Sequence, residues 1–290
     1  MEVFLKPISY GYIVAVCIKM NLNELYNLNS LEKIQKTGIT SVVAAIGIFD
    51  GIHLGHRKII SELFKLAKKY NSAPIIITFN PHPKQLFNPS VKFQFLRSPE
   101  EKAEIFANLG IKAMITIPFT RQLSQVSAEQ FLQIITHIQG VPLKAICVGK
   151  HWRFGSKGLG SWETLTEYSD AFGYEFKPVD EVKLEETVIS SSLIRKMLQE
   201  GKFQIANNML DSKYCLTGNI ISQEVYPKST NFIADLTYGV MPFSKEYPAD
   251  IYCGNSVVKG IFIPLDSDKL IIKCDSTVVF TDSKIKIDLA

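Results

Sequence analysis

Two histidines, His53 and His56, stand three residues apart in a stretch that also contains three glycines. The stretch follows an apolar run at residues 42–48, which is typical of a buried parallel strand. After it, apolar residues recur at helical spacing through residues 57–67. A strand, a glycine-rich turn and a helix start form an anion site, because glycine allows close approach and the helix N-terminus presents N–H groups. We therefore expect both histidines to face one anion, and a nucleotide phosphate suits them.

The same histidine pair is also compatible with a surface pair or with half of a zinc site. Zinc needs a third and usually a fourth protein ligand. The other histidines are dispersed, and the five cysteines form no C-x-x-C pair. We therefore predict no metal ligands among the side chains. The sequence contains neither the P-loop motif G-x-x-x-x-G-K-[ST] nor the dinucleotide fingerprint G-x-G-x-x-G.

Length and composition favour a globular enzyme. A chain of 290 residues predicts one large and one small domain, and 46% hydrophobic residues provide a sizeable core. A net charge of +4, without basic residues interleaved with aromatics, argues against a nucleic-acid partner. The apolar stretch at residues 8–18 is about half the length that spans a bilayer, so we expect no membrane insertion. Five irregularly spaced cysteines predict free thiols in a reducing cytoplasm.

Strands and helices alternate along most of the chain. Apolar strands are expected at residues 75–79, 113–117, 145–149 and 175–179, with helices at 99–109, 128–138, 162–172 and 191–198. This alternation predicts an α/β fold with a Rossmann-like, doubly wound parallel sheet, which binds ligands at the carboxyl ends of its strands. From about residue 215, short alternating segments predict a small antiparallel β domain.

Residues 47–56 read G-I-F-D-G-I-H-L-G-H. This resembles the signature of the HxGH nucleotidyltransferases, in the form carried by bacterial FAD synthetases, which are usually bifunctional riboflavin kinase/FMN adenylyltransferases. H-x-G-H alone is shared by several nucleotidyltransferases, and the preceding G-I-F-D-G makes the match more specific. Two further stretches also resemble family motifs: T-F-N-P-H-P at residues 78–83 and I-S-S-S-L-I-R at residues 189–195. The matches cover roughly residues 40–215 in the order of the family.

A fourth stretch, V-G-K-H-W-R-F-G at residues 148–155, departs from the pattern V-G-x-D-F-x-F-G that it resembles. His151 stands where an acidic or amide residue is usual. An acidic side chain there could accept from a ribose hydroxyl or help to position magnesium. A neutral histidine can still make one hydrogen bond but brings no negative charge. A tolerated change and an altered catalytic function both remain open.

The resemblance implies adenylyl transfer, in which an FMN phosphate oxygen attacks the α-phosphorus of ATP in line and expels pyrophosphate to give FAD, with Mg²⁺ bridging the phosphates. Such chemistry needs positioning and charge stabilisation. A serine run before a helix is a good N-cap and also suits phosphate. The resemblance implies catalytic roles for His53, His56 and Arg195. Implied nucleotide-binding residues are Gly47, Phe49, Asp50, Gly51, Gly55, Gly149, His151, Arg153, Ser190, Ser191 and Ser192. Implied FMN-binding residues are Thr78, Phe79, Asn80, Pro81 and His82.

The resemblance divides the chain into an N-terminal extension at 1–39, a nucleotidyltransferase domain at 40–210 and a truncated riboflavin-kinase-like β-barrel at 211–290. Relatives carry a G-x-P-T-A-N motif in the kinase barrel, and no P-T-A-N occurs here. We therefore expect a cytoplasmic FMN adenylyltransferase without riboflavin kinase activity. The alternatives are a bifunctional enzyme, an HxGH nucleotidyltransferase with another phosphorylated substrate, and a catalytically weak flavin- or nucleotide-binding protein.

Overall fold

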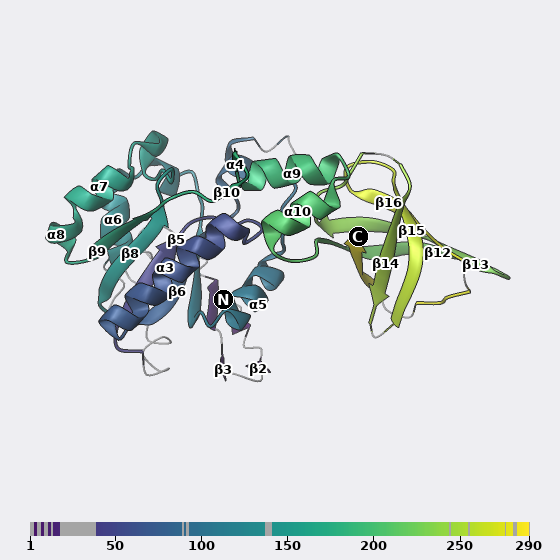
Figure 1. Ribbon diagram of the computed structural model, residues 1–290, viewed down its shortest axis with the longest axis horizontal. Helices are drawn as coiled ribbons and strands as arrows, with labels where there is room; N and C mark the ends of the chain where they lie inside the picture. The colour runs from purple at the N-terminus through teal and green to yellow at the C-terminus, as the bar shows by residue number, and fades with distance from the viewer. Residues whose placement is uncertain are drawn as a thin grey trace. The chain divides into compact units, whose positions relative to one another are not determined.

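The computed structural model describes residues 3–4, 7–8, 11–12, 14–17, 39–88, 90, 93–136, 141–243, 245–254, 256–275, 277–280 and 283–289 (Figure 1). The chain divides into two compact units. The first unit contains Met1–Phe49, Gly55–Phe93 and Pro99–Val182, and the second contains Asp50–Leu54, Gln94–Ser98 and Lys183–Ala290.

A seven-stranded sheet in the order β1-β4-β7-β6-β5-β8-β9 forms the centre of the first unit. All neighbouring strands are parallel except β1 and β4. From β5 the chain continues to β6 and β7 on one side, and then returns to β8 and β9 on the other. The strand order therefore reverses between β5 and β8, which is where doubly wound sheets bind their ligands. The strands are β1 (Val3–Phe4), β4 (Val14–Cys17), β5 (Val42–Ile46), β6 (Ala73–Asn80), β7 (Ala113–Pro118), β8 (Leu143–Gly149) and β9 (Glu175–Val179).

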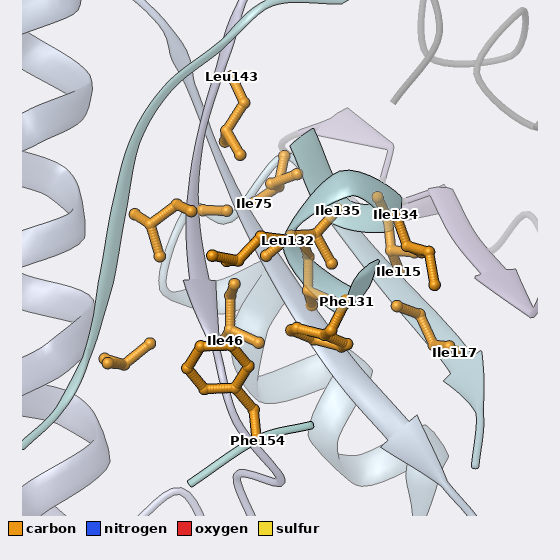
Figure 2. Packing of buried hydrophobic residues seen from close by; sticks show 14 of the residues in the cluster. Ile46, Ile75, Ile115, Ile117, Phe131, Leu132, Ile134, Ile135, Leu143 and Phe154 are labelled. Atoms are coloured by element: carbon orange, nitrogen blue, oxygen red, sulfur yellow. The ribbon is translucent and has the colours of Figure 1, made fainter. Parts of the chain in front are cut away.

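Helices cover both faces of this sheet, as the expected Rossmann-like fold requires. Helix α6 (Ala128–Thr136) packs on one face, where Phe131 lies among Ile46, Ile75 and Ile115 (Figure 2). Helix α3 (Leu54–Tyr70) lies on the other face, since the Cys147 thiol donates to its Ile59 carbonyl at 3.7 Å (Figure 1). The apolar runs of the central strands are buried on both sides for this reason.

The remaining helices agree with the sequence pattern apart from one break and one addition, the short helix α4, which the pattern did not predict. The helix expected at residues 162–172 is divided at Tyr168, and Gly173 ends it in the left-handed conformation. Within the described part of the chain, no helix combines the length and hydrophobicity needed to cross a membrane. These helices are α4 (Pro83–Phe87), α5 (Pro99–Asn108), α7 (Trp162–Glu167), α8 (Ser169–Phe172), α9 (Ser191–Gln199) and α10 (Phe203–Leu210).

Residues 1–39, expected as an extension, contribute β1 and β4 to the large sheet. The short strands β2 (Pro7–Ile8) and β3 (Gly11–Tyr12) pair with each other. The boundary at residues 39 and 40 stays a prediction.

The second unit contains a closed antiparallel barrel in the order β12-β13-β16-β15-β14-β17. Alternate side chains fill its interior, among them Phe232, Phe262 and Ile272, which are fully buried. The expected small antiparallel β domain is confirmed. Its strands are β12 (Cys215–Tyr226), β13 (Ser229–Tyr238), β14 (Tyr247–Cys253), β15 (Ser256–Pro264), β16 (Lys269–Cys274) and β17 (Lys284–Leu289).

Candidate active site

The turn between β5 and α3 has a constrained backbone. Phe49, Gly51 and Ile52 have φ angles of 51°, 90° and 47°, in the left-handed region that glycine favours. Such a conformation costs about 1–3 kcal/mol at a residue with a side chain, so the surroundings must hold it. Phe49 and Ile52 are both fully buried, and the Phe49 ring meets the edge of Phe106 at 5.7 Å. Burial of these two side chains therefore fixes the path of the turn.

The Ile48 carbonyl, at the start of this turn, accepts hydrogen bonds from two elements of the first unit. The Thr78 hydroxyl of β6 donates at 3.1 Å, and the Lys102 ammonium of α5 donates at 3.3 Å. We expected Thr78 to bind FMN, and the structure places its hydroxyl on the turn. Lys102 was not among the expected site residues. Its signal was a lysine four positions before the buried Phe106, on the apolar face of the helix.

His53 immediately precedes α3, and His56 belongs to its first turn. His53 is buried at 5% exposure and His56 is half-buried, with its ring 5.2 Å from that of Phe49. The first turn of α3 contains no acidic side chain. The first N–H groups of a helix lack intrahelical acceptors and carry partial positive charge. An anion at this helix start would therefore meet the positive end of the helix dipole.

Burial lowers the pKa of His53 from 6.5 to about 4. The imidazole is therefore neutral at pH 7, with one N–H donor and one acceptor nitrogen. A bound polyphosphate would favour the protonated ring, because a neighbouring negative charge raises the pKa of an imidazole.

This shift predicts a stability change in acid. Between pH 6.5 and about 4, the unfolded chain binds a proton at His53 that the folded protein does not bind, so the free energy of unfolding rises with pH. Across this window the His53 shift changes the free energy of unfolding by about 3 kcal/mol, and the protein becomes less stable as the pH falls. Urea unfolding of the wild type and His53→Gln from pH 4 to 7 measures it, and the variant should lack this component. Identical pH dependence of the two proteins would refute the assignment.

In the second unit, Asp50 is the centre of a buried polar group. The residue is 2% exposed, and one carboxylate oxygen accepts from the Leu96 backbone N–H at 3.0 Å. The other oxygen forms an ion pair with Nη2 of Arg195. The Nε of the same arginine donates to the Gln94 carbonyl at 2.9 Å. Burial lowers the pKa of Arg195, and the Asp50 charge opposes this effect. The guanidinium keeps its charge because the starting pKa is so high.

The serines at the start of α9 have different partners. The sequence left the cap open between Ser190 and Ser191, and Ser190 caps the helix with its hydroxyl accepting from Leu193 N at 3.2 Å. The Ser191 hydroxyl donates to the Asp50 carbonyl at 2.8 Å, while Ser192 is exposed. The second unit thus joins Asp50 to Ser191 and Arg195.

The loop after β8 follows the half-buried Gly149 at the switch point of the sheet. His151 and Arg153 are both exposed, and His151 Nε2 lies 3.2 Å from Glu181 Oε1. Gly155 closes the motif with φ of 69°, and a Cβ there would lie 2.8 Å from the Ala128 nitrogen. Only glycine fits this close approach between backbones.

The residues expected to bind FMN lie at the end of β6. Phe79 is buried in the core, whereas Asn80 and Pro81 are exposed and joined by a cis peptide bond. The His82 ring lies 4.2 Å from that of Phe93, and its Nδ1 accepts from the Lys84 nitrogen at the start of α4. Exposure therefore begins at Asn80, the last residue of β6, and continues into the loop.

Further aromatic side chains lie at the same end of the sheet. Phe87 of α4 is 61% exposed and meets the Phe119 ring edge-on at 6.2 Å. Phe119 follows β7 and also contacts Phe79 at 6.2 Å. An exposed aromatic surface suits a flat, partly apolar ring system.

A Rossmann-like sheet whose H-L-G-H turn leads into a helix N-terminus is the arrangement that the sequence motif predicted. Residues 35–193 match the FAD synthetase family. Because this match covers more than half of the 290 residues, the chain belongs to the FAD synthetase family.

Known relatives agree with this assignment. The chain is 32% identical over 197 residues to a bifunctional riboflavin kinase/FMN adenylyltransferase from Buchnera aphidicola subsp. Schizaphis graminum, covering 67% of this chain and 62% of the relative. It thus spans less than two thirds of that relative. It is 27% identical over 186 residues to an FAD synthetase from Listeria monocytogenes, covering 64% of this chain and 74% of that protein.

A similar crystal structure supports the fold. It is described as a macrolide-efflux protein from Streptococcus pneumoniae and superposes with a TM-score of 0.73 at 23% identity, covering 86% of this chain and 84% of that one. At this level of identity the likeness establishes the shared architecture.

Proposed function

We propose that this protein is an FMN adenylyltransferase that converts FMN and ATP to FAD and pyrophosphate. The H-L-G-H turn at the N-terminus of α3 carries the proposal, because its residue types and backbone suit a polyphosphate. Membership of the FAD synthetase family supports FMN as the acceptor.

In the proposed reaction, an FMN phosphate oxygen attacks the α-phosphorus of ATP and the bond to the β-phosphate oxygen breaks. His53 and His56 donate to the phosphate oxygens on which charge develops. The exposed Ser192 and the N-terminal N–H groups of α9 bind the β- and γ-phosphates, with Arg195 supplying positive charge. The protein contributes positioning and charge stabilisation and forms no covalent intermediate.

The FMN ring is proposed to bind at the carboxyl ends of β6 and β7. The exposed Asn80 and Pro81, together with His82 and the aromatic residue Phe87, support this location. Thr78 and Phe79 are buried, so we propose that they support this surface from beneath.

Magnesium is proposed to enter as MgATP, bound largely by phosphate and water. The described residues contain no group of three or more His, Cys, Asp or Glu side chains that could hold a metal ion. A cytoplasmic location is also proposed. The free, buried thiols of Cys147 and Cys274 support it.

Incubation of the purified protein with FMN, ATP and Mg²⁺ tests the proposal. We expect FAD and pyrophosphate in equal amounts. Release of pyrophosphate with another phosphorylated acceptor, and not with FMN, would favour a different nucleotidyltransferase. Tight FMN binding without turnover would favour a flavin-binding protein, and either result would overturn the proposal.

We expect no riboflavin kinase activity from the barrel. The sequence lacks P-T-A-N and has no histidine after His151 and no arginine after Arg195, which leaves few groups for phosphate transfer. The measurement is chromatography of riboflavin incubated with ATP and Mg²⁺, using FMN in place of riboflavin as the positive control for FAD formation. Conversion of riboflavin to FMN would show that the protein is bifunctional.

A further inference from the structure

Two consecutive side-chain pairs join the loops that follow β8 and β9. Lys150 Nζ lies 2.6 Å from Asp180 Oδ1, and His151 Nε2 lies 3.2 Å from Glu181 Oε1. The main chain supports them, because the Lys150 N–H donates to the Val179 carbonyl at 3.0 Å. The parallel pairing of the two strands thus continues beyond their ends as side-chain contacts.

Helix α3 reaches the same segment. Lys58 Nζ donates to the Glu181 carbonyl at 3.3 Å, and Lys58 lies two residues after His56. Glu181 is therefore held by its backbone to α3 and by its carboxylate to the loop after β8. This places the His151–Glu181 pair beside the switch point of the sheet.

We propose that Glu181 is a positioning residue that fixes His151 as a hydrogen-bond acceptor for ATP, an inference that rests on the proposed function. A neutral imidazole carries one N–H, and a carboxylate at Nε2 selects the tautomer with the proton there. Nδ1 then carries the lone pair. The His151 side chain is 77% exposed, so it is accessible to a ligand. The donors that ATP offers are its ribose hydroxyls and its adenine amino group.

The pair is suited to orientation and contributes little to folding. Both side chains are exposed, at 77% and 41%, and such surface pairs have little effect on stability. Without the carboxylate, the exposed ring turns freely and its proton exchanges between the two nitrogens, so the acceptor nitrogen no longer has a fixed position and the hydrogen bond to ATP is lost. Loss of Glu181 should therefore weaken ATP binding and leave the fold intact.

Steady-state kinetics of Glu181→Ala test the proposal. We expect KM for ATP to rise about three- to tenfold, the loss of one hydrogen bond, with kcat within about twofold of wild type. Glu181→Gln should restore KM in part, because its amide oxygen can accept from Nε2–H while its NH2 group can also donate to that nitrogen. The matched control is Asp180→Ala, which removes the neighbouring pair with Lys150 and should leave KM unchanged.

A second background separates positioning from a merely structural role. The amide of His151→Asn has its own acceptor oxygen, so adding Glu181→Ala to this variant should change nothing further. Three results would each overturn the proposal. The first is an unchanged KM in Glu181→Ala, and the second is an equal rise of KM in Asp180→Ala. The third is an effect of Glu181→Ala in the His151→Asn background as large as in the wild type.

Nucleotide analogues identify the donor. With 2′-deoxy-ATP, 3′-deoxy-ATP or inosine triphosphate, the analogue that lacks the relevant donor should bind wild type and Glu181→Ala equally. A full Glu181→Ala effect with all three would contradict the inference. If the wild type formed no FAD, the proposed function would fail, and calorimetric titration of the same variants with ATP would still decide the role of Glu181.

Discussion

Replacing His56 with alanine is expected to lower kcat/KM for FAD formation by about 10²–10³-fold, and replacing His53 is expected to have a comparable effect. Removal of one donor that stabilises charge in the transition state typically has this consequence. Both residues lie at the start of α3, where the helix N-terminus adds its own positive charge. The measurement is the initial rate of FAD formation at saturating FMN with ATP varied.

Two controls make this result specific. His56→Asn retains an N–H donor and should lose less activity than His56→Ala. The double variant should lose less than the product of the two single effects, because residues that act on one group are not additive. Circular dichroism melting shows whether each variant folds. FAD formation at the wild-type rate by folded His53→Ala or His56→Ala would contradict the assignment.

Replacing Asp50 with alanine is expected to lower the free energy of unfolding by about 3–5 kcal/mol, because it leaves a buried guanidinium without its ion-pair partner. The Arg195 side chain is 15% exposed and that of Asp50 is 3% exposed. Asp50 also accepts from the Leu96 backbone, so the turn before His53 loses a second contact. Urea denaturation of the purified variants measures the change.

The exposed pair Lys183–Glu186 provides the matched control, with side chains 55% and 98% exposed. Glu186→Ala should change stability by less than about 0.5 kcal/mol. Replacing Asp50 and Arg195 together should cost less than the sum of the single replacements, since no buried charge is left unpaired. Additive losses for this pair would show that the two residues act independently.

Most of the fold could be predicted from the sequence, because the features that determine it are local. The apolar runs of β5, β6, β7 and β8 predict buried strands wherever both faces of a sheet are covered. The serine run before α9 indicated a helix start, because serine hydroxyls cap helices. The antiparallel barrel followed from the change in alternation after residue 215.

The contacts around the candidate site were harder to predict, because they join residues that are far apart in the chain. Asp50 pairs with Arg195 at a separation of 145 residues, and the Lys102 ammonium reaches the Ile48 carbonyl across 54 residues. No local pattern encodes such pairings. Motif membership also does not show which side chains are exposed: Thr78 and Phe79 are buried, whereas Asn80, the last residue of the same strand, is exposed.

A crystal structure with FMN and α,β-methylene-ATP, whose α–β linkage cannot be cleaved, tests the central claim most directly. We expect the triphosphate at the turn between β5 and α3, with nitrogens of His53 and His56 within hydrogen-bonding distance of its oxygens. A nucleotide bound away from this turn, with both imidazoles contacting only protein, would contradict the account.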